Sequence, residues 1–108
     1  ILAAGQAILA CGIKTVIISL GEEGAYFISK EHTLYSPGLQ VEAHSTVGAG
    51  DAMVAAYVFG MDQGYSEVER AKLAMATSAG AVMTIGTKPP TRTVVDALLK
   101  EVVVTKFV

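Results

Sequence analysis

The chain of 108 residues has few cysteines, few charges and no long apolar run. Its single cysteine, Cys11, cannot form a disulfide within the chain, and we expect an inert buried thiol. Charged residues make up 17%, the net charge is −2 and Lys and Arg do not cluster, so nothing favours nucleic acid as a partner. The longest uncharged run, residues 73–87, is too short and too polar for a membrane span, and no secretory leader is recognisable. The sequence predicts a cytoplasmic protein that binds no membrane.

Apolar residues, in contrast, are abundant. They make up 52% of the chain, which is ample for the packed core of one domain. We expect part of this apolar surface to pack against another segment of protein. The chain starts at Ile1, without an initiator Met, within a sequence that favours helix. We therefore interpret residues 1–108 as a single domain that is a piece of a larger protein.

The first half of the chain alternates helical and extended patterns. Residues 1–11 favour a helix that Gly12 ends. Residues 15–20 are β-branched, uncharged and bounded by glycines, which predicts a strand buried on both faces, as in a parallel sheet. Residues 25–29 and 33–35 predict a hairpin with a polar turn. Helix followed by buried strand indicates the α/β class.

The second half is mainly helical. Small and apolar residues surround the segment 51–62, which predicts a helix buried on most sides. Ser66 is a candidate N-cap for a helix that ends near Met83, and Thr91 or Thr93 can cap a last helix that ends near Glu101. Residues 102–108 predict a short terminal strand.

A glycine-rich turn before the first of these helices carries the chemistry. Without bulky side chains, the amides of Gly48, Ala49 and Gly50 can converge on one point, where the helix dipole adds positive potential. Such places bind anions. Asp51 beside an anion site suggests a base that takes a proton from a nucleophile attacking the anion, hence phosphoryl transfer. The simpler reading of Asp51 is a carboxylate that stabilises the helix start by about 0.3–1 kcal/mol.

Residues 45–58 resemble the C-terminal signature of the PfkB (ribokinase-like) family of sugar kinases, with every position filled acceptably. Residues 15–27 resemble the nucleotide-binding strand and loop of the same family. Within it, these two stretches are most similar to the phosphosugar branch that contains 1-phosphofructokinase and tagatose-6-phosphate kinase. The resemblance implies the C-terminal part of a ribokinase-like fold, with a parallel-sheet core, helices and a short hairpin.

The resemblance also implies roles for particular residues. Asp51 would be the general base, and Gly48, Ala49 and Gly50 would form the anion hole for the transferring phosphoryl group. The ATP phosphates and ribose would lie against the loop after the first strand, with the Ser19 hydroxyl and the Gly21 amide as contacts. Met75 would flank the adenine, although Met on a helix is usually core. The expected nucleotide-binding residues are Ser19, Leu20, Gly21, Glu22, Glu23, Gly24, Gly50, Asp51 and Met75, with Glu22 and Glu23 turned to solvent.

The expected cofactors are ATP and Mg²⁺, with the Mg²⁺ ligands mostly outside this chain. In several family members a carboxylate at the position of Ser45 helps to hold a monovalent cation. A hydroxyl is a poorer ligand for a hard cation, so the sequence leaves this ion open. His32 and His44 lack metal-ligand spacing, so we predict no metal site on them and expect both to be solvated.

Three functions stay open at this stage. The first is an ATP-dependent kinase of a sugar phosphate. The second is a PfkB enzyme of another branch, such as ribokinase, adenosine kinase or pyridoxal kinase. The third is a nucleotide-binding module without catalysis, against which the intact Asp51 argues. The expected partners are ATP, a small sugar or sugar phosphate and the missing N-terminal portion of the same enzyme. A homodimer is also compatible with the sequence. We expect no turnover from this piece alone.

Overall fold

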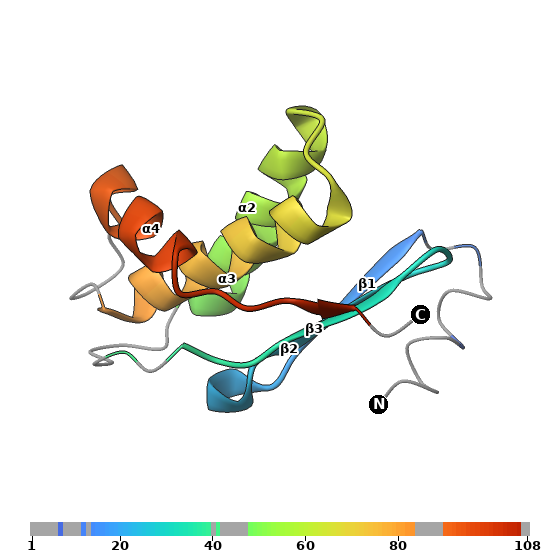
Figure 1. Cartoon of the computed structure of the whole chain (residues 1–108), viewed down its shortest axis with the longest axis horizontal. Coiled ribbons are helices and arrows are strands. Elements are labelled where there is room, and N and C mark those ends of the chain that lie inside the picture. The colour runs from blue at the N-terminus through green and yellow to red at the C-terminus, as the bar shows by residue number, and fades with distance from the viewer. Residues whose placement is uncertain are drawn as a thin grey trace.

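The computed structural model describes residues 14–39, 41, 48–83 and 90–106, together with residues 7 and 12. In this part of the chain a small sheet carries a layer of helices on one face (Figure 1). The elements are β1 (Thr15–Ser19), the short 3₁₀ helix η1 (Gly21–Glu23), β2 (Ala25–Ser29), β3 (Thr33–Ser36), α2 (Ala49–Asp62), α3 (Glu67–Met83), α4 (Arg92–Leu99) and β4 (Thr105–Lys106). The helix expected over residues 1–11 lies outside the described residues apart from Ala7.

The described sheet has the strand order β1-β2-β3-β4, and every pairing in it is antiparallel. The predicted hairpin is confirmed as β2 and β3, with Phe27 opposite Leu34. The prediction that the first strand belongs to a parallel sheet is wrong for this pairing, because β1 runs antiparallel to β2 with Ile17 opposite Phe27. The reason is the connection: η1 is three residues long, whereas parallel neighbours need a crossover of a dozen residues or more. β1 is also only partly buried.

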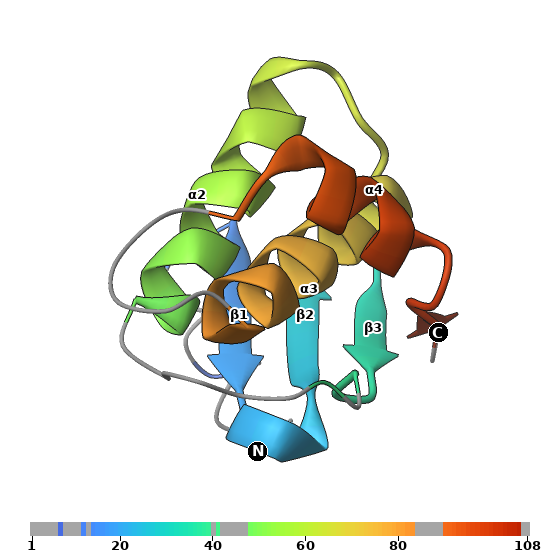
Figure 2. The same cartoon turned by 90° about the vertical axis from the view of Figure 1, so that its left-hand side faces the viewer.

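The core lies between the sheet and helix α3, which crosses in front of β1 and β2 (Figure 2). Phe27 and Leu34 from the sheet pack against Met75, and alanines on the same side of α3 are fully buried. Small side chains let α3 pack closely against α2, α4 and strand β3. Tyr57 from α2 stacks on Phe27, with 5.6 Å between the ring centroids, and burial raises the pKa of its phenol.

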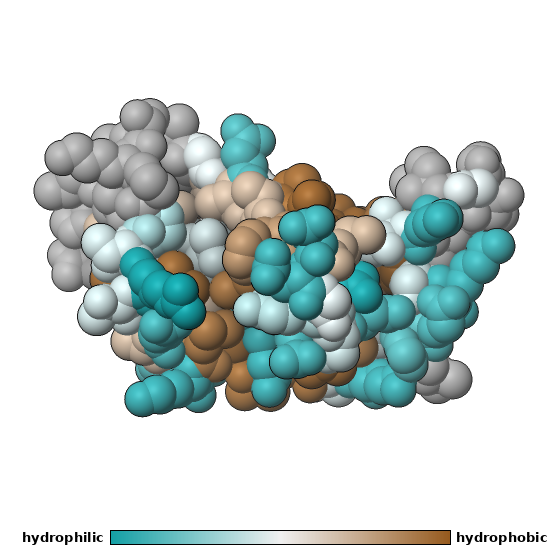
Figure 3. All heavy atoms as spheres, turned by 90° about the horizontal axis from the view of Figure 1, so that it is seen from above, coloured by the Kyte–Doolittle hydropathy of each residue, from teal (hydrophilic) through white to brown (hydrophobic). Residues whose placement is uncertain are grey.

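Helix α2 is less buried than its composition predicts. It packs through Met53, Ala56, Tyr57 and Gly60, which follow helical spacing along one side. Val54 and Val58 on another side are 52% and 56% exposed, so the prediction of a helix buried on most sides is wrong within the described residues. Seen from the helical side, apolar surface appears among the hydrophilic groups (Figure 3). Composition shows that α2 is apolar all round but not which elements cover it.

Side chains begin the other two helices as predicted. Ser66 and Glu69 exchange hydrogen bonds at the start of α3: the Ser66 amide donates to Glu69 Oε1 (3.1 Å) and the Glu69 amide donates to Ser66 Oγ (3.2 Å). This reciprocal pair is a capping box. Thr91 rather than Thr93 caps α4, since its Oγ1 accepts from the Val94 amide (3.3 Å). α4 ends at Leu99, and the terminal strand is shortened to Thr105–Lys106, with residues 107–108 outside the described part.

A polar contact joins the hairpin to α3. Glu67 Oε2 accepts from Ser29 Oγ (2.9 Å) and lies 3.2 Å from His32 Nδ1. The expectation that His32 is solvated is therefore wrong: its side chain is 33% exposed and pairs with a carboxylate. The residues are far apart in sequence, which hid the pairing. Among the described helices, none combines the length and hydrophobicity that crossing a bilayer requires.

Candidate active site

The glycine-rich turn starts helix α2 without a side-chain cap. Gly48 is the N-cap, in the left-handed conformation at φ +86°, and the first helical hydrogen bond runs from the Ala52 amide to the Gly48 carbonyl (2.9 Å). The amides of Gly48, Ala49, Gly50 and Asp51 precede this bond, so they are the helix's four donors without an intrahelical acceptor. The sequence had pointed to the first three, and the helix start adds the amide of Asp51.

Space surrounds this turn. A Cβ added to Gly50 would meet no atom of the described residues within 4 Å, and Gly50 lacks the positive φ that would require glycine. Packing therefore does not explain a glycine in the first turn of a helix, where it is less favourable than alanine by about 1 kcal/mol. Asp51 is exposed, and its position along α2 places it in line with Val54 and Val58. Among the described residues, the turn thus combines amides without a side-chain cap, open space and one carboxylate.

The second predicted element, the loop after β1, is closed by backbone hydrogen bonds. The Leu20 amide donates to the Gly24 carbonyl (2.7 Å), and the Gly24 amide donates to the Gly21 carbonyl (3.2 Å). Ser19 at the end of β1 is exposed, as are all three residues of η1, so Glu22 and Glu23 face solvent as expected. The loop therefore presents the Ser19 hydroxyl and the Gly21 backbone outward.

The end of β3 and the residues after it hold this loop, and sequence reasoning missed them. The Tyr35 hydroxyl donates to the Glu23 carbonyl (2.6 Å). A Cβ on Gly24 would lie 2.0 Å from the Ser36 carbonyl oxygen, and a Cβ on Gly38 would lie 2.1 Å from that of Glu22. Pro37 and Gly38 carry no recognisable nucleotide-binding motif. The repeated glycines were a signal for close backbone approach, but they did not show which segments meet.

The structure brings the two predicted elements toward the same end of the sheet, where η1 and the first turn of α2 both lie (Figures 1 and 2). Met75 is different. It is only 5% exposed and packs in the core with Phe27 and Leu34. A contact of Met75 with adenine stays a prediction, while its packing role is evident.

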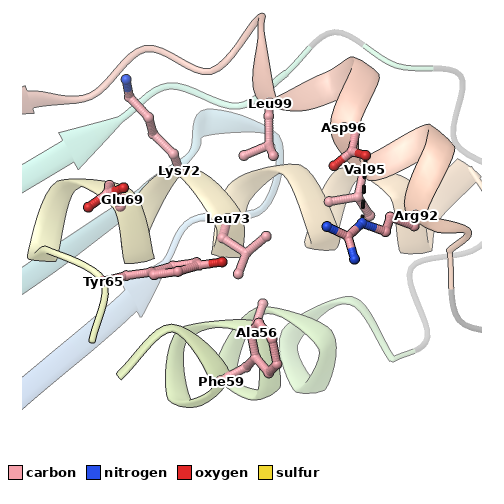
Figure 4. A pocket seen from close by; sticks show the side chains of 10 residues that line it. All are labelled: Ala56, Phe59, Tyr65, Glu69, Lys72, Leu73, Arg92, Val95, Asp96 and Leu99. Carbon is pink, nitrogen blue, oxygen red and sulfur yellow. Dashed lines mark ion pairs between the residues drawn. The ribbon is translucent and has the colours of Figure 1, made fainter. Parts of the chain in front are cut away.

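A surface pocket of about 640 Å³ lies elsewhere, between α2, α3 and α4 (Figure 4). It contains none of the predicted site residues. Arg92 and Asp96 form an exposed ion pair at its rim, with 3.8 Å between Nε and Oδ2. Its lining residues are Ala56, Phe59, Tyr65, Glu69, Lys72, Leu73, Arg92, Val95, Asp96 and Leu99. This mixture of apolar groups and paired surface charges offers no cluster of like charge for phosphates.

Metal ligands are sparse in the described part of the chain, where no three His, Cys, Asp or Glu side chains are grouped for a metal ion. His44 and Ser45 lie outside the described residues, so the prediction about a monovalent cation stays untested.

Comparison with known proteins identifies the family. The family described as pfkB family carbohydrate kinase matches residues 1–94. The chain is 40% identical over 106 residues to a 1-phosphofructokinase of Haemophilus influenzae, covering 97% of this chain and 34% of that protein. It thus spans about a third of that relative's length.

Solved structures agree. Phosphofructokinase-2 from Escherichia coli superposes with a TM-score of 0.85 at 29% identity, over 92% of this chain and 32% of that one. A ribokinase from Thermotoga maritima does so with a TM-score of 0.83 at 30% identity, over 91% and 34%. The described helices and antiparallel sheet are therefore a piece of the ribokinase-like fold, and the chain belongs to the pfkB family of carbohydrate kinases.

Proposed function

We propose that the enzyme containing this chain transfers the γ-phosphoryl group of ATP to a hydroxyl of a sugar phosphate, as a 1-phosphofructokinase-like kinase. The observation that carries this proposal is the start of α2, where four backbone amides lack a side-chain cap and Asp51 stands exposed beside them. The 40% identity to a 1-phosphofructokinase supports the sugar-phosphate acceptor.

The reaction uses Asp51 as the general base. Its carboxylate accepts the proton of the sugar hydroxyl while the hydroxyl oxygen bonds to the γ-phosphorus. The bond from that phosphorus to the bridging oxygen of ADP breaks, and ADP leaves with the electron pair. The amides of Gly48, Ala49 and Gly50 stabilise the charge on the transferring group, because donors fixed before the reaction need not reorganise.

The phosphates and ribose of ATP lie against residues 19–24, with the Ser19 hydroxyl and the Gly21 amide as contacts. This loop and the glycine turn point to one site because they lie at the same end of the sheet. Family membership implies Mg²⁺, which neutralises phosphate charge when bound. The carboxylate of Asp51 is used as the base, so we place the Mg²⁺ ligands mostly in the rest of the enzyme.

The rest of the enzyme also completes the sugar site. Val54, Val58 and Met61 recur at helical spacing from Asp51 and are 50–56% exposed. An apolar stripe that continues from the candidate base suits a second part of the same protein, which would supply the acceptor sugar next to Asp51. The 108 residues alone should therefore not catalyse the kinase reaction.

The test of the mechanism is Asp51→Asn in the full-length enzyme. We expect kcat to fall about 10²–10⁴-fold with little change in ATP affinity, because the amide cannot accept the proton. Asp62→Asn at the other end of α2 is the matched control, since Asp62 is also exposed on the same helix. An unchanged kcat for Asp51→Asn would remove the base and favour a module that only binds nucleotide.

A second candidate function is phosphorylation of an unphosphorylated sugar, favoured by the 30% identity and TM-score of 0.83 with a ribokinase. An ADP-release assay across fructose 1-phosphate, tagatose 6-phosphate, fructose 6-phosphate, ribose and adenosine separates the two. We expect the highest kcat/KM for fructose 1-phosphate, or failing that tagatose 6-phosphate. A clear preference for ribose or adenosine would contradict the sugar-phosphate assignment.

A further inference from the structure

We propose that Gly38 and Tyr35 are positioning residues that fix the nucleotide loop relative to the glycine turn, and so set the affinity for ATP. The inference rests on the proposed function, since it assumes that residues 19–24 contact ATP. It concerns residues that carry no recognisable nucleotide-binding motif and that contact the backbone of the loop.

The backbone of the loop crosses the backbone of residues 36–38 at van der Waals contact. A Cβ on Gly38 would lie 2.1 Å from the Glu22 carbonyl oxygen and 2.8 Å from its carbon. A Cβ on Gly24 would lie 2.0 Å from the Ser36 carbonyl oxygen. Each segment thus has a glycine where the other's backbone passes, and any side chain at either position forces the segments apart.

A hydrogen bond from β3 fixes the orientation of the loop relative to the sheet. The Tyr35 hydroxyl in β3 donates to the Glu23 carbonyl in η1 at 2.6 Å, which is a short hydrogen bond. The Tyr35 ring itself packs on Tyr26, with 4.9 Å between the centroids. Since β3 holds the ring and the ring holds η1, the loop cannot tilt freely away from the sheet.

The crossing segment leads to the other half of the candidate site. From Gly38 the chain reaches the glycine turn at Gly48 within ten residues. The same segment therefore supports the loop and starts the connection to the turn, and both halves lie at one end of the sheet. A ligand that contacts both elements is held correctly only if their spacing is kept. A displacement of about 1 Å can lower the rate of a reaction about 10²-fold.

The experiment measures ATP binding and turnover in the full-length enzyme with Gly38→Ala and Tyr35→Phe. We expect Gly38→Ala to raise KM for ATP and Kd for a non-hydrolysable ATP analogue about 10-fold or more, with KM for the acceptor sugar unchanged. Tyr35→Phe should raise them about 2- to 10-fold, the loss of one hydrogen bond. If Gly38→Ala fails to fold, Tyr35→Phe still decides the question.

Gly64→Ala is the control. Gly64 has a positive φ of +76° but no described atom within 4 Å of an added Cβ, so it tests backbone strain without a clash, in the turn between α2 and α3. Its ATP affinity should equal that of the wild type. Equal affinity in Gly38→Ala and Tyr35→Phe, or a parallel rise in both KM values, would overturn the positioning role while Asp51→Asn still tests the mechanism. If the wild type binds no analogue, the proposed function fails and this inference with it.

Discussion

The first turn of α3 carries a side-chain cap, whereas the first turn of α2 has none among the described residues. Ser66 and Glu69 close a capping box at α3, and Thr91 caps α4. At α2 the cap position is Gly48, which has no side chain to offer. Because Gly48 has φ +86°, where a side chain is strained, the backbone itself favours glycine at this cap. The difference supports our proposal that the amides of α2 bind a ligand.

The glycines of the two candidate ATP-binding elements differ in how closely other atoms surround them. Gly24 and Gly38 are required by crowding, since a Cβ on either would overlap another backbone segment. Gly48 and Gly50 have open space around them in the described structure. Gly24 and Gly38 therefore serve the fold, and the positive φ of Gly48 favours glycine as well, whereas Gly50 has neither reason in the described structure.

The strongest test of this comparison is Gly50→Val. Valine and glycine have broadly similar helix propensities at exposed positions, so the fold should persist. Its branched side chain should block close approach of phosphate to the amides, and we expect kcat/KM for ATP to fall about 10²-fold or more in the full-length enzyme. Steady-state kinetics and calorimetry with an ATP analogue measure the change. Wild-type values in both would show that the turn is no anion hole.

Gly50→Ala separates stability from function. Alanine fits the helical φ and the open space, so the free energy of unfolding should rise by up to about 1 kcal/mol. Affinity for ATP should fall by less than with valine. Urea denaturation of the 108-residue chain and kinetics of the full-length enzyme provide the two measurements. A variant that is more stable and equally active would argue that Gly50 has no part in binding.

Ser66→Ala is the complementary change at α3. It removes the hydroxyl that accepts from the Glu69 amide, and the free energy of unfolding should fall by about 1 kcal/mol. Turnover should not change, because Ser66 belongs to neither candidate element. Chemical denaturation checks the first expectation and kinetics the second. Lost activity at full stability would break the contrast between the two helix starts.

The smallest expected effect is a pH dependence of the α3 cap. The Ser66 amide, followed by the Ser66 side chain, holds the pKa of Glu69 below its ordinary value of 4.5. A carboxyl with a lowered folded pKa stabilises the fold above its unfolded pKa, and this contribution is lost as pH falls through the folded pKa. The stability difference between wild type and Glu69→Gln should therefore be largest at neutral pH and shrink below pH 4.5. A difference that is constant with pH would exclude the charged cap.

Local features were predictable because neighbouring residues determine them. The polar turn before β3 fixed the hairpin, and Ser66 with Glu69 fixed the start of α3. The glycine turn and Asp51 were found from their spacing alone, since a helix start and its carboxylate lie within a few residues of each other. The family likewise followed from two short stretches.

Contacts between distant residues were not predictable. Gly24 and Gly38 carry no sign in the sequence that they meet, and neither do His32 and Glu67. The exposure of Val58 depends on which elements cover α2, a property of the tertiary arrangement. Likewise, a run of β-branched residues shows that β1 is a strand but not the direction of its neighbour.

The sheet described above has two unlike edges. On one side β4 is only two residues long and carries Lys106, and short, charged edge strands resist pairing with other chains. On the other side β1 offers five residues, Thr-Val-Ile-Ile-Ser, with no further partner strand in the described sheet. An uncharged, β-branched edge is a template for intermolecular strand addition. In the described sheet, β1 is therefore the edge suited to adding another strand, and a charged substitution in β1 would disfavour such pairing where one in β4 would not.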